Sequence, residues 1–411
     1  MVMLTHIRHD IDEILPGVIA DRRYLHEHPE LGFEEYETAK FIGQRLAALG
    51  VDDIRTGING TGITGLIQGC GCGGGSDTEQ GTDRVILLRA DIDALPILEE
   101  NEVDYVSQHP GVMHACGHDA HTAILLGVAR TLVEHRDLFV GTVKLLFQPA
   151  EEVGVGGAIG MIAEGVLENP HVNAVFGLHM NPAVPTGTVQ VGAGPIFAAA
   201  DEFDITVFGK GGHGAYPSNA IDPIAIGMQI AGALHTLVSR ELDPMAQAVV
   251  NVCAFHAGQA HNVVPSTATL RGTVRSFDPD LRDQLQQRIA EIATTIAEAS
   301  GATAEILYVQ GCPAAINDPG FTDLVRDSAI TALGRDNVQL MKQEMGAEDF
   351  AWFLQERPGS YIYVGSRNVE RGIVSDCHHS RFDIDEDCLA TGIEITVAVV
   401  MTYLAHVPEN V

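Results

Sequence analysis

The chain has 411 residues, of which 45% are hydrophobic and 19% charged, so it can bury a large core and form two or three domains. The formal net charge of −31 opposes binding to the phosphate backbone of nucleic acid or to an anionic membrane surface. These numbers exclude nucleic acid and membranes as expected partners and are typical of an ordinary globular protein.

At the N-terminus, no basic segment precedes an apolar one, so no secretory signal is predicted. No later stretch approaches about 18 uninterrupted apolar residues, so we expect no membrane span. The seven cysteines are scattered and odd in number, which argues against a disulfide framework and favours reduced thiols in the cytoplasm.

Helical periodicity covers residues 10–49, and the sequence HEHPELGFEE, with Pro29 and Gly32, predicts a break between two helices. A Gly-rich stretch at 60–65 follows, and then the segment 70–83, whose composition predicts a flexible surface loop. Cys70 and Cys72 form a C-x-C pair without partners, so we interpret them as part of this loop rather than as a metal site.

Short apolar runs then alternate with helical patterns, which predicts parallel strands joined by crossover helices. The expected strands are 85–88, 143–147, 174–178 and 361–365, and the expected helices are 121–135, 158–167 and 385–404. This pattern predicts an α/β catalytic domain with a mainly parallel sheet and helices on both faces.

A segment with a different pattern of expected strands and helices interrupts this domain. Its expected elements are strand 201–209, helix 221–240, strands 246–257 and 266–277, helix 279–300 and strand 303–309. The order β, α, β, β, α, β is typical of a ferredoxin-like α+β domain. We therefore expect a discontinuous catalytic domain at 1–193 and 311–411, with a smaller domain inserted at 194–310.

Polar clusters stand at the ends of the expected parallel strands or at the start of a helix. They are RADID (89–93), CGHDAH (116–121), QPAEE (148–152) and LHM (178–180). Ligand sites in open α/β sheets form at the carboxyl ends of strands, so clusters far apart in sequence are expected to converge on one crevice.

The residue types in these clusters suit a metal centre. Cys116 and His118 are two residues apart in a loop, and Glu152 and His179 add a carboxylate and a second imidazole. The late sequence CHHSRFDID (377–385) offers a further histidine. Such a ligand set favours two ions about 3.5–4 Å apart, which activate water and polarise a carbonyl group.

Glu151 and Glu152 are adjacent, so their side chains point in different directions in an extended segment. One carboxylate of the pair can then bind a metal while the other acts as a base towards the metal-activated water. Single histidines and Glu-Glu pairs are usually structural or solvated, and it is their joint placement that indicates function.

At these residues the sequence resembles the metal-dependent aminoacylase and carboxypeptidase superfamily, in particular its amidohydrolase branch of hippurate and auxin-conjugate hydrolases. The resemblance covers nearly the whole chain. Its motifs are HEHPELGFEE, RADIDALPI, HACGHDAH, FQPAEE, GLHM, GKGGHGAYP, HNVVPSTATLRGTVRSF and MGAEDFAWF.

The resemblance implies a ferredoxin-like lid that often dimerises, and two divalent ions such as zinc, manganese, nickel or cobalt. It assigns the ion ligands to Cys116, His118, Glu152, His179 and His378. It makes Glu151 the general base and acid.

Arg89 stands where the peptidase branches carry a histidine ligand, as is usual in the amidohydrolase branch, and Arg cannot bind a metal. Asp91 is then expected to orient a ligand without contacting the metal. For the last ligand we prefer His378 to His379, because it lies four residues before Phe382, although Ser380 replaces the usual proline.

In the expected lid, His213 and Asn262 match family positions that reach the substrate and stabilise the oxyanion. Arg275 resembles the residue that binds the substrate carboxylate.

The function implied is hydrolysis of the amide bond of a small N-acyl amino acid or related amide, in a homo-oligomer formed through the lid. A dipeptidase or carboxypeptidase of the same superfamily and a non-catalytic metal-binding protein remain alternatives. Free dipeptides as the better substrates would favour the former, whereas retention of both Glu151 and Glu152 speaks against the latter.

Overall fold

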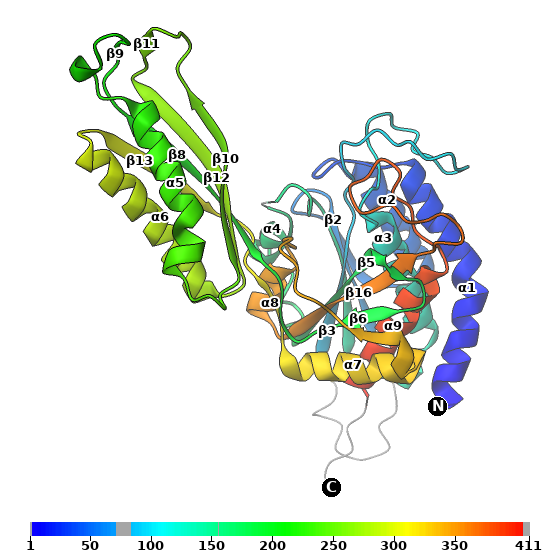
Figure 1. The fold of residues 1–411 in the computed structure, drawn as a ribbon. Helices are drawn as coiled ribbons and strands as arrows, with labels where there is room; N and C mark the ends of the chain where they lie inside the picture. Colours follow the sequence, from blue (N-terminus) through cyan, green and yellow to red (C-terminus); the bar gives the residue numbers. More distant parts are fainter. Residues whose placement is uncertain (1, 71–83, 155, 406–411) are drawn as a thin grey trace. The chain divides into compact units, whose positions relative to one another are not determined.

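The computed structural model describes residues 2–70, 84–154 and 156–405, and the chain divides into two compact units (Figure 1). Unit 1 comprises Met1–Gly194, Ile316–Lys342 and Trp352–Val411, and unit 2 comprises Pro195–Ala315 and Gln343–Ala351. The predicted loop at 70–83 lies, apart from Cys70, outside the described residues.

Unit 1 is built on an eight-stranded sheet in the order β1-β2-β4-β3-β5-β16-β6-β15. The strands are β1 (Asp52–Ile58), β2 (Gly62–Gln68), β3 (Val85–Asp91), β4 (Thr142–Gln148), β5 (Ala174–Pro185), β6 (Val189–Val191), β15 (Val338–Leu340) and β16 (Gly359–Arg367). The four central strands β4, β3, β5 and β16 pair in parallel. Every residue of β3 is buried, as expected for a strand in the middle of an α/β sheet. The predicted α/β domain with a mainly parallel sheet is therefore confirmed.

Helices of unit 1 cover this sheet. They are α1 (Val2–Glu27), α2 (Tyr36–Leu49), α3 (His118–Glu134), α4 (Gly157–Ala163), α7 (Pro319–Leu333), α9 (Cys388–Tyr403) and, apart from its first residue, α8 (Ala351–Glu356), with 3-10 turns at Arg136–Leu138 and Arg335–Asn337. Two glycines allow α3 and α9 to approach closely: a Cβ added to Gly127 would lie 2.5 Å from Ile393, and one added to Gly392 would lie 2.5 Å from Ile124. This contact packs the middle of α3 closely against α9.

Two features of unit 1 go beyond the predicted elements. The Gly-rich stretch 60–65 runs from the turn of the hairpin β1–β2, where Asn59 and Gly60 have positive φ, into strand β2 itself. Helix α7 begins with Asp318 as its N-cap, whose side chain accepts from the backbone N–H of Phe321, followed by Pro319 at the first helical position.

Unit 2 contains β8 (Ala199–Phe208), α5 (Pro223–Glu241), β10 (Ala248–Ala257), β12 (Thr267–Ser276), α6 (Pro279–Ala299) and β13 (Thr303–Gln310). The four strands form an antiparallel sheet in the order β10-β12-β8-β13. Apolar side chains of α5 and α6 pack with those of the sheet in one core. The short strands β9 (Gly212–His213) and β11 (Val263–Val264) pair separately, next to a 3-10 turn at Pro217–Asn219. β7 (Gly194–Phe197) and β14 (Ala315–Asn317) lie on the connecting segments.

The segment Gln343–Ala351 clusters with unit 2, although its sequence position falls in the second part of the expected catalytic domain. The backbone N–H of Ala198 donates to the carbonyl groups of Glu344 and Gly346, and the Cys312 thiol donates to the Glu348 carbonyl at 3.0 Å. In the described parts of the chain, every helix is too short or too polar to cross a lipid bilayer.

Candidate metal centre

The polar clusters predicted from the sequence meet at one edge of the unit 1 sheet. Asp91 lies opposite Gln148 in the parallel register of β3 and β4, so RADID and QPAEE leave the sheet side by side. CGHDAH opens α3, and His179 lies within β5, which continues past it rather than ending there. The groups whose possible ligand atoms all lie within 4.8 Å of one another include Cys116–His118–His179, Cys116–Glu152–His378 and His118–Glu151–Glu152.

A left-handed turn aims Cys116 and His118 at the same point. Gly117 between them is the N-cap of α3 with φ +97°, a conformation that favours glycine, and an added Cβ would approach Met180 to 3.1 Å. Cys116 is 8% exposed, and its Sγ lies 3.4 Å from Nε2 of His179. The neighbouring thiol of Cys377, together with burial, raises the pKa of Cys116, so the thiol is protonated until a cation competes with the proton.

The imidazole of His118 is oriented by Asp93. Nδ1 of His118 lies 2.9 Å from the carbonyl oxygen of Asp93 and 3.1 Å from its Oδ1, so Nδ1 carries the proton and donates. Nε2 is buried and has no hydrogen-bond partner among the described residues. Burial opposes a charge on the ring, but Asp91 and Asp93 raise the pKa of His118, so a metal ion at Nε2 would take the place of a proton beside a thiol and carboxylates.

The two adjacent glutamates sit on a turn that buried side chains hold in place. Ala150 has φ +56°, and its N–H donates to Oε1 of Glu35 at 2.9 Å. The other oxygen of Glu35 accepts from the Thr61 hydroxyl at 2.6 Å. The N–H of Glu152 donates to Oδ2 of Asp93 at 2.9 Å, so Asp93 supports both His118 and this turn.

The motif HEHPELGFEE therefore supports the candidate site from outside it. Besides Glu35 it contributes Gly32, where an added Cβ would lie 2.5 Å from Val153 and 3.1 Å from the backbone of Ala150. This close approach explains the glycine at that position.

His378 joins the centre, and the neighbouring His379 faces elsewhere. His378 has φ +64°, its N–H donates to the Ala115 carbonyl at 2.7 Å, and its Nε2 lies 3.1 Å from Oε1 of Glu152. The bond to Glu152 raises the pKa of His378. The ring of His379 instead accepts from the N–H of Arg381 at 3.0 Å.

Asp91 is hydrogen-bonded by His121 and Arg89, neither of which is an expected metal ligand. One of its oxygens lies 2.5 Å from Nδ1 of His121, and the other accepts from Arg89 at 2.6 Å. Its separation from Nε2 of His118 is 3.7 Å, too long for a hydrogen bond. Burial opposes its charge, but Arg89 and the two histidines hold the pKa of Asp91 well below its usual range. The carboxylate that contacts an expected ligand directly is thus Asp93, whereas Asp91 binds His121, which the sequence analysis did not single out.

The donor set fits two divalent cations. Two of the three-residue groups share Cys116, which places its sulfur between an imidazole pair on one side and a carboxylate with an imidazole on the other. Thiolate, imidazole and carboxylate ligands in such an arrangement suit zinc and its neighbours in the first transition row. A carboxylate beside the ligands, that of Glu151, is within reach of the same space.

Unit 2 carries the remaining predicted site residues. His213 and Asn262 are exposed and lie together, because β9 and β11 pair and the N–H of Gly214 donates to the Asn262 carbonyl at 2.8 Å. Arg275 lies eight residues beyond Thr267, the first residue of β12, and so roughly 26 Å along the strand. Its guanidinium donates to the hydroxyl of Thr273 and to the Val274 carbonyl. Within unit 2, Arg275 is therefore apart from the His213–Asn262 pair.

Nearly the whole chain is similar in sequence to a family of known proteins. A family model described as Peptidase family M20/M25/M40 matches residues 87–402. The chain is 39% identical to thermostable carboxypeptidase 1 of Saccharolobus solfataricus, over 95% of this chain and 96% of that protein. It is 40% identical to an N-acetyl-L-cysteine deacetylase of Bacillus subtilis, over 90% of this chain and 84% of that protein.

Among solved structures, the YXEP protein of Bacillus subtilis, a dinuclear metal-binding peptidase from family M20, has a TM-score of 0.83 and 34% identity. The similarity covers 96% of this chain and 99% of that one. The match to the family model extends from β3 into α9 and so includes all the clusters that form the candidate centre.

Proposed function

This chain belongs to peptidase family M20/M25/M40, and on that premise we propose that it hydrolyses the amide bond of small N-acyl amino acids or related amides. The observation that carries the proposal is the Cys116-centred cluster with a second carboxylate, Glu151, close to the ligand atoms of His118 and Glu152. Such a constellation suits metal-assisted hydrolysis, in which ligands and base are distinct groups.

We assign the ligands of two divalent ions to Cys116, His118, Glu152, His179 and His378, which all belong to unit 1. Zinc, manganese, nickel or cobalt suits this set, and the thiolate favours the softer of these metals. When bound, the ions supply Lewis acidity, which lowers the pKa of water and polarises the amide carbonyl.

Glu151 acts as the proton carrier. Its carboxylate takes the proton of the attacking water and delivers it to the nitrogen of the leaving amine. In Glu152, next to it, Oε1 pairs with Nε2 of His378 at 3.1 Å, so we assign the two adjacent carboxylates separate roles. The products are an amino acid and an organic acid.

For unit 2 we propose a ferredoxin-like lid through which two copies of the chain associate. Its strand order β10-β12-β8-β13 supports this description. We assign substrate contacts to His213, Asn262 and Arg275, the first two as donors to the carbonyl oxygen and the last as a carboxylate binder. The oligomeric state is measurable by light scattering coupled to size-exclusion chromatography.

A dipeptidase or carboxypeptidase activity is the second candidate, because one close relative is named a thermostable carboxypeptidase. Both candidates use the same centre and differ in substrate. A panel of N-acetyl, N-benzoyl and indole-acetyl amino acids together with dipeptides separates them by the rate of amine release.

The proposal is tested by Glu151→Gln in chelated protein reloaded with each divalent metal. We expect kcat to fall about 10²–10⁴-fold because the proton carrier is lost, with the metal content per chain unchanged. Glu134→Gln, an exposed glutamate paired with Arg130 on α3, is the matched control and should retain full activity. Near-normal turnover by Glu151→Gln with the same metal content would refute the mechanism.

A further inference from the structure

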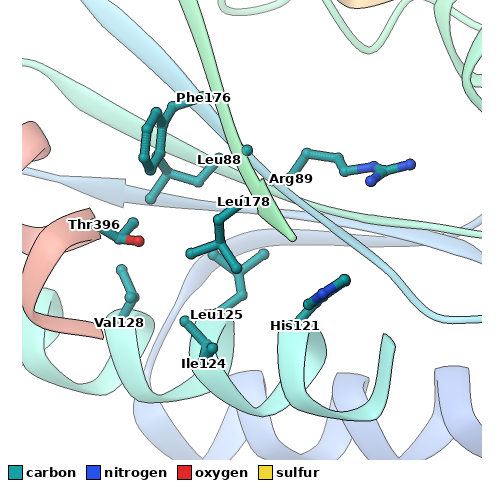
Figure 2. A pocket seen from close by; sticks show the side chains of 10 residues that line it. Leu88, Arg89, His121, Ile124, Leu125, Val128, Phe176, Leu178 and Thr396 are labelled. Carbon is teal, nitrogen blue, oxygen red and sulfur yellow. The ribbon is translucent and has the colours of Figure 1, made fainter. Parts of the chain in front are cut away.

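His121 is a buried histidine next to the candidate centre that the proposed mechanism does not use. It is 2% exposed and lies in the first turn of α3. Figure 2 shows His121 and Arg89 bordering a small cavity that is otherwise lined mainly by apolar side chains such as Leu125 and Phe176. The cavity volume is about 10 Å³, so the ring is closely surrounded.

The hydrogen bonds of His121 fix its tautomer. The backbone N–H of Met180 can only donate, so Nε2 of His121, 2.9 Å away, must accept. Nδ1 therefore carries the proton and donates to Oδ1 of Asp91 at 2.5 Å. Although Asp91, His118 and His121 lie within 4.8 Å of one another, both nitrogens of His121 are engaged, so this ring has no lone pair left for a metal.

The residue whose backbone N–H His121 binds, Met180, also sets the orientation of a proposed ligand through its carbonyl group, which belongs to the following peptide. The carbonyl oxygen of Met180 accepts from Nδ1 of His179 at 2.8 Å. This bond leaves the lone pair of His179 on Nε2, the nitrogen that lies 3.4 Å from the Cys116 sulfur. The rings of His121 and His179 are also in contact, with centroids 4.6 Å apart at an interplanar angle of 66°.

Arg89 anchors the other end of this chain of hydrogen bonds. It donates to Asp91 at 2.6 Å and to the side-chain oxygen of Gln148 at 2.9 Å, so β3 and β4 hold it from two directions. Thr122, next to His121, donates its hydroxyl to the Asp91 carbonyl at 3.1 Å. The result is a continuous path from Arg89 through Asp91 and His121 to the backbone beside His179.

We propose that His121 is a positioning residue that holds His179 in its metal-binding orientation through the backbone of Met180, whose N–H it binds and whose carbonyl accepts from His179, with Asp91 and Arg89 fixing its tautomer. The assignment rests on the proposed metal centre and extends it, since His121 touches neither metal nor substrate. The proposal also gives Arg89 a role. This residue stands where the peptidase branches carry a histidine ligand, and here its guanidinium keeps the Asp91 carboxylate charged and in place.

Substitutions of His121 test this role by metal binding rather than by activity. In His121→Phe the ring shape remains and both hydrogen bonds are lost, whereas in His121→Gln a side-chain oxygen can still accept from Met180. The groups that support metal ligands typically contribute 10–100-fold to metal affinity. We therefore expect His121→Phe to weaken one of the two binding steps for Co²⁺ by about that factor and to change the visible absorption of the Co²⁺ protein. His121→Gln should recover part of both.

The matched control is His135→Phe, which removes an imidazole from the C-terminal end of the same helix, where it lies 2.8 Å from Asp10. Co²⁺ affinity and spectrum should be unchanged in this variant. Unchanged affinity and spectrum in His121→Phe would overturn the positioning role, and if that variant does not fold, the Gln variant decides alone by the same two measurements. Because Co²⁺ binding is measured without substrate, absence of amide hydrolysis in the wild type would count against the proposed function and leave this test intact.

Discussion

At the scale of single residues, Asp93 connects more of the candidate centre than any motif suggests. Its carboxylate holds the Nδ1 proton of His118 and accepts from the backbone of Glu152, so one side chain positions a proposed ligand and the turn that carries another. Asp91, two positions earlier, serves His121 instead. Two aspartates of the same RADID cluster, two positions apart, thus support different histidines.

Replacement of Asp93 by alanine is expected to lower the affinity for the divalent ions by about 10–100-fold, because His118 loses its side-chain partner and the Glu152 backbone its acceptor. Competition with a chromogenic chelator measures the affinity. Asp53→Ala is the control, since its carboxylate is exposed and pairs with Arg55 at the sheet edge. Equal affinities in wild type and Asp93→Ala would contradict the role of Asp93.

At the scale of elements, the centre depends on where strands end and how sharply the chain turns there. The parallel strands β3 and β4 deliver their polar residues to one edge, and left-handed positions at Gly117, Ala150 and His378 then turn the side chains inward. Two of these three positions are not glycine, so the backbone there is held in a costly conformation by its surroundings. Such positions are common at functional sites.

Strand β4 also contains a buried lysine whose charge opposes folding. Lys144 is 4% exposed and donates to the Glu168 carbonyl at 2.9 Å, and burial lowers its pKa from 10.5 to about 8. Between these pH values the unfolded chain binds more protons than the folded chain, so the free energy of unfolding rises with pH over this window.

Lys144→Met should remove that rise and increase the free energy of unfolding at pH 7 by about 1–2 kcal/mol, because no charge has to be buried. Urea titrations of wild type and variant from pH 7 to 10.5 give the difference curve. Lys342→Met, at an exposed lysine, should leave the pH dependence as in the wild type. A Lys144→Met curve parallel to that of the wild type would show that folding does not shift this pKa.

At the scale of the whole molecule, charge is the dominant feature. A formal net charge of −31 arises from 55 acidic and 24 basic residues, so long-range repulsion acts throughout the folded protein. Salt screens such repulsion, since the Debye length falls from about 30 Å at 0.01 M to about 10 Å at 0.1 M.

We therefore expect the midpoint of thermal unfolding of the chelated protein at pH 7.5 to rise as sodium chloride increases from 0.01 to 0.5 M. Over this range the Debye length falls from about 30 Å to less than 10 Å. The same titration near pH 5, close to the isoelectric point of about 4.7, is the control and should show a much smaller rise. A midpoint that is flat or falls with salt at pH 7.5 would mean that repulsion does not limit stability.

The sequence by itself determined the mainly parallel sheet and the convergence of Cys116, His118, Glu151, Glu152 and His179 on one cluster. Strand and helix periodicity are local properties of the chain, and the carboxyl ends of parallel strands must share an edge, so both inferences need no tertiary detail. The Asp318–Pro319 start of α7 is likewise a local signal of the chain.

Only the tertiary structure decided which acidic side chain supports which imidazole. Asp91 and Asp93 belong to the same RADID cluster and His378 and His379 are adjacent residues of one type, and the partners of each depend on hydrogen bonds to segments far away in sequence. The same holds for Glu35, which reaches the Ala150 turn across 115 positions, and for His121, which joins α3 to β5. Hydrogen bonds require distances near 3 Å and defined angles, and such distances follow from the packing of helices on the sheet, which residue spacing alone does not specify.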